Sequence, residues 1–256
     1  MNFQAITYEN EGDVAVLRLN RPEVMNALNR QMRHEITQAV EIAGKSARVL
    51  VIAGMGRAFC AGQDLADTTA AFDLQAVLDD EYVPMLRAIH DCPVPTIAAV
   101  QGAAAGAGAN LALACDVVIA SEAASFTQAF TRIGLIPDAG GTWALPRQIG
   151  LARAMGAMLF ADKITARQAA DWGMIYEAVP DAEFATHWQA RAVALATGPT
   201  AAYRHLKSAL QATFDNNLDA QLALEAQLQG ACGQTADFTE GVAAFLQKRP
   251  AVFQGR

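Results

Sequence analysis

The chain has 256 residues, of which 53% are hydrophobic and 18% charged, and its formal net charge at pH 7 is −7. This composition predicts a compact globular protein and excludes a disordered chain. The acidic balance, and the lack of clustered Lys and Arg in the sequence, argue against a surface for nucleic acid.

Neither end-of-chain signals nor apolar stretches indicate secretion or a membrane. Residues 1–6, MNFQAI, lack the basic segment and apolar core of a secretory signal. Residues 93–115 carry no charge, but their prolines and glycines fit a strand, a turn and a helix better than a membrane span. Four cysteines lack CxxC spacing, so we expect buried, reduced thiols, no metal site and a cytoplasmic protein: Cys60, Cys92, Cys115 and Cys232.

Apolar periodicity predicts alternating strands and helices in the first part of the chain. Strands are expected at residues 3–8, 14–20, 49–53, 96–100 and 117–120, and helices at 26–43, 74–90 and 106–115, with a further helix beginning near Thr142. Repeated strand, turn and helix are typical of a parallel sheet with right-handed crossovers, and the pattern alone also allows a doubly wound sheet.

After about residue 195 the pattern changes to helices only. They are expected at residues 200–213, 218–232 and 237–248. The sequence therefore indicates an α/β domain over residues 1–195 and a small helical C-terminal domain over 196–256.

Three turns carry the chemical signal. They are residues 57–65 (RAFCAGQDL), 102–108 (GAAAGAG) and 136–142 (IPDAGGT). The first two follow apolar runs and are expected to open helices, which would aim unpaired backbone N–H groups at a ligand above the strand ends. Because Ala and Gly let a ligand oxygen approach the main chain, two such turns side by side would form an oxyanion hole.

These segments, together with residues 19–28 (LNRPEVMNAL) and 245–250 (FLQKRP), resemble the crotonase superfamily of enoyl-CoA hydratases and isomerases. The resemblance implies a ββα spiral with a helical oligomerisation domain, a homotrimer or dimer of trimers, and an acyl-CoA substrate with no separate cofactor. It places the oxyanion N–H donors on Gln63 and Ala107. It implies CoA contacts at Arg21, Met25, Ala27, Ala61, Asp64, Leu65 and Lys248, the last often from a neighbouring subunit.

Asp138 is the candidate catalytic base. It lies between Pro137 and the Gly140-Gly141 pair, a setting that also fits an ordinary turn or helix-capping aspartate. The resemblance implies more, because isomerases of the superfamily place a catalytic aspartate at the matching position. An apolar pocket would raise its pKa from the free value of about 3.9.

The acyl pocket implied by the resemblance comprises Tyr82, Asn110, Phe130 and Gly141. Asn110 and Phe130 match the two glutamates with which hydratases of the superfamily activate water. Neither can act as a carboxylate base, so proton transfer by one carboxylate is favoured over hydration. Structural roles stay open: helix capping for Asn110, a core or solvated position for Tyr82 and for Glu81.

Several other polar residues also have structural interpretations. Asp64 is expected to orient its turn through backbone hydrogen bonds, and Arg21 to form either a phosphate contact or an ion pair. Cys60 lies beside the first turn, but no histidine is placed to activate it, and the four histidines are expected at the surface: His34, His90, His187 and His205. A core position is also open to Trp143.

Within the superfamily, residues 58–65, 104–113, 134–146, 170–175 and 240–249 most resemble the isomerases of bacterial phenylacetate catabolism. The resemblance implies an acyl-CoA isomerase that converts 1,2-epoxyphenylacetyl-CoA to oxepin-CoA, or moves a β,γ double bond to α,β. A hydratase or lyase of the same fold would need a second carboxylate. A non-catalytic CoA- or RNA-binding relative is disfavoured by the intact Asp138 and the acidic charge. The loop 67–74 departs from the family pattern.

Overall fold

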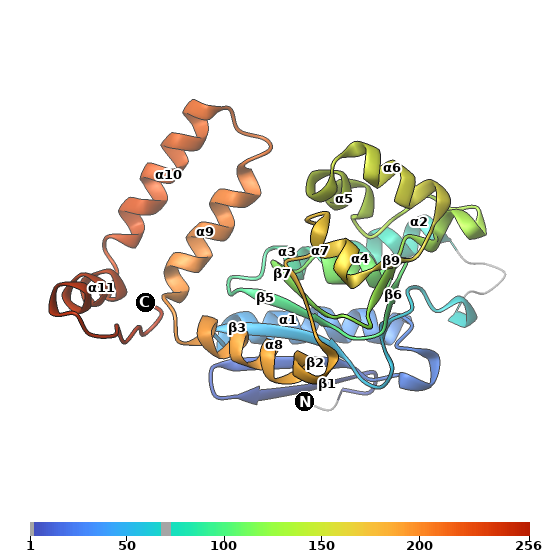
Figure 1. Cartoon of the computed structure of the whole chain (residues 1–256), viewed down its shortest axis with the longest axis horizontal. Helices are drawn as coiled ribbons and strands as arrows, with labels where there is room; N and C mark the ends of the chain where they lie inside the picture. The colour runs from blue at the N-terminus through green and yellow to red at the C-terminus, as the bar shows by residue number, and fades with distance from the viewer. Residues whose placement is uncertain (1–2, 68–72) are drawn as a thin grey trace.

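Two β-sheets organise the computed structural model, which describes residues 3–67 and 73–256 (Figure 1). The larger sheet has the order β1 (Ile6–Glu11), β2 (Val14–Leu19), β3 (Val49–Gly54), β5 (Thr96–Val100), β7 (Val117–Ser121) and β10 (Glu177–Val179). The smaller sheet has the order β4 (Ala58–Cys60), β6 (Ala103–Ala105), β8 (Ser125–Thr127) and β9 (Ile164–Thr165).

The chain crosses from the larger sheet to the smaller one three times. β3 leads to β4, β5 to β6 and β7 to β8, and helices follow each pair. Strands β3, β5 and β7 are parallel neighbours, as are β4, β6 and β8. This arrangement confirms the ββα spiral and rules out a single doubly wound sheet.

The helices surround the sheets and extend beyond them. They are α1 (Arg30–Ser46), α2 (Leu74–Val77), α3 (Val83–His90), α4 (Ala107–Leu113), α5 (Gly141–Ile149), α6 (Leu151–Phe160), α7 (Ala166–Asp171), α8 (Asp181–Ala196), α9 (Thr200–Ala212), α10 (Leu218–Cys232) and α11 (Ala236–Gln247). A π-helical segment, Leu78–Tyr82, joins α2 to α3. Short 3-10 segments lie at Pro22–Val24, Leu65–Asp67 and Ala129–Ile133.

Strand β3 is buried on both faces, as its unbroken apolar sequence VLVIAG indicates. Leu50 and Ile52 share a core cluster with residues of α1, whereas Val49 and Val51 share another with Phe184 of α8. The larger sheet is therefore covered by α1 on one face and α8 on the other.

Three predictions about individual elements were wrong. The first strand covers Ile6–Glu11 instead of residues 3–8. The first helix begins at Arg30 instead of residue 26, because Asn26 has φ +56° and donates its buried amide to the carbonyls of Met55 and Ala58, both at 2.9 Å. Asn29 then caps the helix by accepting from the Met32 N–H at 2.9 Å. Residues 103–105, expected within a turn, form strand β6, since alanines fit between its two parallel neighbours.

The last three helices, α9 to α11, stand to one side of the two sheets (Figure 1). They carry exposed apolar side chains, and Phe245 on α11 is 82% exposed. Among the described residues no helix is long and apolar enough to cross a membrane. All four cysteines are free thiols, and Cys232 is the one that is only partly buried.

Candidate active site

The turns that follow β4 and β6 lie side by side because these strands are parallel neighbours. Gly62, in the first turn, has φ +98°, a conformation that favours glycine. A Cβ at Gly62 would lie 2.8 Å from the Ala105 carbonyl oxygen and 3.4 Å from the Ala107 nitrogen. The two turns therefore abut, and only glycine at residue 62 leaves the Ala107 N–H accessible.

Gln63 and Ala107 each present an unpaired N–H. Leu28 forms a parallel bridge with Gln63, donating to the Gly62 carbonyl at 2.7 Å and accepting from the Asp64 N–H at 3.1 Å. This pattern turns the Gln63 N–H away from Leu28. Ala107 is the first residue of α4, so its N–H has no acceptor inside the helix. Neither group has a hydrogen-bond partner in the described part of the chain, so each is available to a ligand oxygen.

The Asp138 turn is held from below by Asn110 of α4. The Asn110 amide donates to the Asp138 carbonyl at 2.8 Å, and its oxygen accepts from Gln128 at 2.8 Å. A Cβ at Gly141 would lie only 2.4 Å from the Asn110 amide nitrogen, so glycine is required there. The Asn110 side chain thus positions the turn by binding the main chain of Asp138, and it does not cap α4.

The Asp138 carboxyl group is half-buried and incompletely paired. Its Oδ1 is buried and has no hydrogen-bond partner in the structure. Desolvation raises the pKa of Asp138 from 3.8 to about 6, against a smaller lowering by a hydrogen bond to its own backbone. A carboxylate with one free oxygen and a pKa near neutrality is suited to accept and return a proton.

Two aromatic side chains flank the N–H pair. The buried Tyr82 hydroxyl donates to Gln63 Oε1 at 2.6 Å. Burial raises the pKa of Tyr82 by more than the nearby Arg33 charge lowers it, and the charge of Asp138 raises it further, so the phenol stays protonated. The Phe130 ring lies 3.8 Å from the position that a Cβ would take at Gly106, directly before α4. Tyr82 therefore lies beside the first turn and Phe130 beside the second.

Most of the expected CoA contacts gather at the first turn. The Ala61 N–H donates to the Met25 carbonyl at 2.9 Å. Arg21 forms an ion pair with Asp64 at 2.8 Å and also donates to the Ala27 carbonyl at 2.7 Å. The ion pair is one of the two roles expected of Arg21.

Asp64 also accepts from the Ala66 N–H at 3.1 Å, which is the expected backbone role. Leu65 is 57% exposed at the rim of the turn. Lys248 ends α11 on the far side of the molecule (Figure 1), so it reaches a CoA site only if it comes from a neighbouring subunit. Residues 68–72, within the loop 67–74 noted above, lie outside the described residues.

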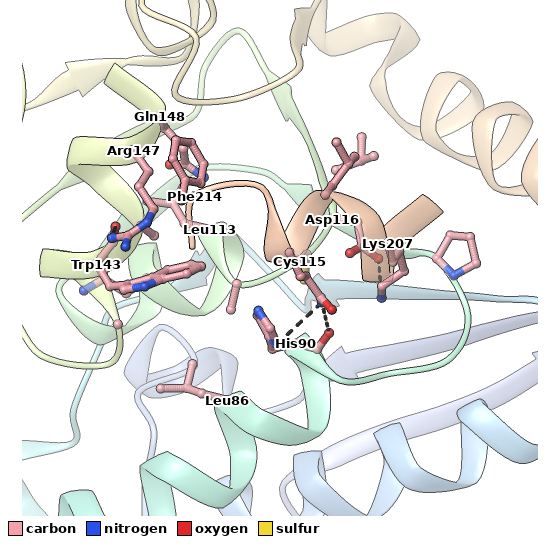
Figure 2. Close-up of a pocket in the computed structure, with 18 of the residues that line it drawn as sticks. Leu86, His90, Leu113, Cys115, Asp116, Trp143, Arg147, Gln148, Lys207 and Phe214 are labelled. Atoms are coloured by element: carbon pink, nitrogen blue, oxygen red, sulfur yellow. Dashed lines mark hydrogen bonds and ion pairs between the residues drawn. The ribbon is translucent and has the colours of Figure 1, made fainter. Parts of the chain in front are cut away.

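A cavity of about 570 Å³ lies behind the Asp138 turn, between α3, α5 and α9. Figure 2 shows Trp143, Arg147 and Phe214 on one side of it and His90 near its floor. The cavity reaches the active-site turn at Ala139 and Gly140, but neither Gln63 nor Ala107 lines it. It is therefore separate from the Gln63 and Ala107 N–H groups.

Trp143 and the four histidines all reach the surface at least in part. Trp143 is 49% exposed instead of lying in the core, because its ring packs under the Arg147 guanidinium at 4.4 Å and against His90 at the cavity wall. The expected surface positions of the histidines are confirmed: His34 is exposed, and the others are partly exposed, as His187 is beside Glu177 at 2.7 Å.

Cys60 and the possible metal ligands were considered as alternatives to a carboxylate base. Burial raises the pKa of Cys60 to about 12, so this thiol stays protonated and is no nucleophile. No group of three or more His, Cys, Asp or Glu side chains that could hold a metal ion occurs among residues 3–67 and 73–256.

Sequence reasoning missed one buried charged pair beside the site. Arg33 of α1 is 1% exposed and forms an ion pair with Glu81 of the π-helical segment at 2.5 Å. The expectation that Glu81 is either core or solvated was therefore incomplete. A signal was present, because Arg33 continues the apolar stripe of Ile36 and Val40, where a charged residue is unusual.

Comparison with known proteins identifies the family. Residues 9–256 match the profile of the enoyl-CoA hydratase/isomerase family. The chain belongs to this family. An enoyl-CoA hydratase/isomerase relative from Rhodobacter capsulatus, named "Probable enoyl-CoA hydratase", is 61% identical over the full length of both chains.

Two further family members extend the comparison. The 1,2-epoxyphenylacetyl-CoA isomerase of Escherichia coli is 45% identical, covering 96% of this chain and 97% of its own. The crystal structure of an enoyl-CoA hydratase from Bacillus anthracis superposes with a TM-score of 0.93 at 31% identity, covering 99% of this chain and 100% of its own. Because these names include both hydration and isomerisation, family membership alone does not choose between the reactions.

Proposed function

We propose that this enoyl-CoA hydratase/isomerase family member is an acyl-CoA isomerase that works through an enolate or dienolate. The observation that carries the proposal is the Asp138 carboxyl group, with its buried, unpaired oxygen and a pKa raised to about 6. The preferred substrates are a β,γ-enoyl-CoA, which gives the α,β isomer, and 1,2-epoxyphenylacetyl-CoA, which gives oxepin-CoA. The likeness to the E. coli epoxyphenylacetyl-CoA isomerase supports the second.

The double-bond reaction needs one base and one anion site. The thioester oxygen accepts the N–H groups of Gln63 and Ala107, which become stronger partners as negative charge develops on that oxygen. Asp138 takes a proton from the α-carbon, and the C–H electron pair enters the dienolate. The same carboxyl group returns the proton to the γ-carbon as the α,β double bond forms. Each preorganised N–H contributes about 2.7–4 kcal/mol to stabilising the transition state.

Hydration is the second candidate, because the R. capsulatus relative is named as a hydratase. It requires a group that activates water. The Asn110 amide is occupied by Asp138 and Gln128, and Phe130 has no proton to exchange. These two side chains favour isomerisation over hydration.

We also propose a cytoplasmic homotrimer or dimer of trimers that needs no cofactor besides the CoA of its substrate. The exposed apolar side chains of α9 to α11 support subunit packing through this region. Lys248 would then contact CoA bound to a neighbouring subunit, with Arg21, Met25, Ala27 and Ala61 forming the contact within one chain.

The test is to compare three substrates in one preparation: a β,γ-enoyl-CoA, 1,2-epoxyphenylacetyl-CoA and crotonyl-CoA. We expect isomerisation of at least one of the first two and slow or no hydration of crotonyl-CoA. Asp138→Asn should abolish the isomerisation while substrate binding persists. Rapid hydration that survives Asp138→Asn would overturn the proposal.

A further inference from the structure

The side chain of Gln63 is fixed by two donors from different elements. Tyr82 donates to its Oε1 at 2.6 Å and Arg33 donates to the same oxygen at 2.9 Å. The Gln63 Nε2 donates to the Asp64 carbonyl at 3.2 Å. Both ends of the amide are therefore held, which limits rotation of the residue whose backbone N–H faces the ligand.

Arg33 also holds the strand partner of this turn. Its Nη1 donates to the Leu28 carbonyl at 2.6 Å, the oxygen that accepts from the Asp64 N–H. One guanidinium nitrogen thus binds both the Gln63 side chain and the main chain of Leu28, which forms a bridge with Gln63. A displaced Arg33 would release both.

Glu81 fixes the guanidinium itself. Its Oε2 accepts from Arg33 Nε at 2.8 Å, and its Oε1 lies 3.5 Å from Arg30 Nε. The guanidinium also stacks over the Tyr82 ring at 4.9 Å. Glu81 and Tyr82 are consecutive residues of the π-helical segment, a helix distortion that is frequent at functional sites.

A buried ion pair is a poor way to gain stability, because desolvation offsets most of the attraction. It does define geometry, since a guanidinium has donors in fixed directions. Resting on the proposed function, we propose that Arg33, held by Glu81, is a positioning residue of the oxyanion hole that fixes the direction of the Gln63 N–H. Arg33 touches no substrate atom and acts through Gln63.

The test uses 4-(dimethylamino)cinnamoyl-CoA, a chromophore whose absorption moves to longer wavelength when its thioester oxygen accepts hydrogen bonds. Wild type, Arg33→Met, Arg33→Lys and Glu81→Gln are saturated with this probe, and kcat and KM for isomerisation are measured in parallel. Arg18→Met is the matched control, because it removes another guanidinium from a half-exposed ion pair, with Glu9, that makes no contact with Gln63. Circular dichroism establishes that each variant is folded.

We expect Arg33→Met to lose at least half of the wavelength shift and about 10- to 100-fold in kcat, with KM within about three-fold of wild type. Arg33→Lys should recover part of both, and Arg18→Met should match wild type. A folded Arg33→Met variant with the full shift and normal kcat would overturn this inference alone. If Arg33→Met does not fold, the isosteric Glu81→Gln decides by the same criteria. A wild-type protein without any shift would overturn the proposed function and this inference together.

Discussion

Replacing Asp138 with Asn should remove activity and at the same time stabilise the protein. The carboxyl group is half-buried with an unpaired oxygen, and its pKa is raised from 3.8 to about 6. Above pH 6 the folded protein must hold this group ionised in a poorly solvated place. Asn keeps the shape of the turn and carries no charge.

The magnitude follows from the pKa. Ionising a carboxyl group whose pKa is raised from 3.8 to about 6 costs the folded state about 3 kcal/mol. Since solvent reaches part of the side chain, we reduce the expected gain in Asp138→Asn to about 1–2 kcal/mol. The folded state binds more protons than the unfolded state between pH 3.8 and 6, so wild-type stability falls as the pH rises through this window.

The assay is urea unfolding of both proteins between pH 4 and pH 8 at one protein concentration. We expect Asp138→Asn to be the more stable protein at pH 7–8, with the difference shrinking toward pH 4. The same variant should lose about 10²- to 10⁴-fold in isomerisation kcat. A variant that is less stable than wild type at pH 8, or a stability difference that does not change with pH, would refute this account of Asp138.

Three further predictions concern the rest of the site. At pH values below about 6 the specificity constant kcat/KM should decrease, because Asp138 becomes protonated; a pH profile that is flat down to pH 4.5 would assign the base to another group. Ala107→Val should lower kcat by about 10²- to 10³-fold in a folded protein, because the branched side chain crowds the oxygen bound at the Ala107 N–H; a steady-state assay with near-normal kcat would remove this residue from the oxyanion hole. Deleting residues 241–256 should weaken both self-association and CoA affinity, and light scattering plus calorimetry that show neither change would contradict a role for Lys248 across the subunit boundary.

Much of the site could be predicted because its requirements are local. A ligand oxygen reaches a peptide N–H only if the neighbouring residues are small. The Ala and Gly runs around Gln63 and Ala107 therefore indicate N–H groups that a ligand can reach. Asp138 is placed by the proline before it and the glycines after it, all within one turn. The strands and helices of the spiral follow from apolar periodicity, which also depends on nearby residues.

Boundaries and weak strands were harder to predict. Residues 103–105 become a strand only because β4 and β8 supply hydrogen bonds on both sides, which no short-range pattern of alanines encodes. The start of α1 is set by Asn26, whose amide binds carbonyls 29 and 32 residues further along the chain.

The sequence by itself predicted alternating strands and helices, and its resemblance to the crotonase superfamily predicted the spiral, the two N–H donors and the candidate base, because both signals depend on residues close together in the chain. Only the tertiary structure decided the pKa of Asp138 and the contacts that hold the turns in place. It leaves one Asp138 oxygen buried without a partner, brings Asn110 beneath a carbonyl 28 residues away, and pairs Arg33 with Glu81 across 48 residues around the Gln63 side chain. Desolvation and long-range hydrogen bonds arise only when distant segments pack together, so the pKa of Asp138 and the fixed position of the Gln63 side chain are properties of the folded chain.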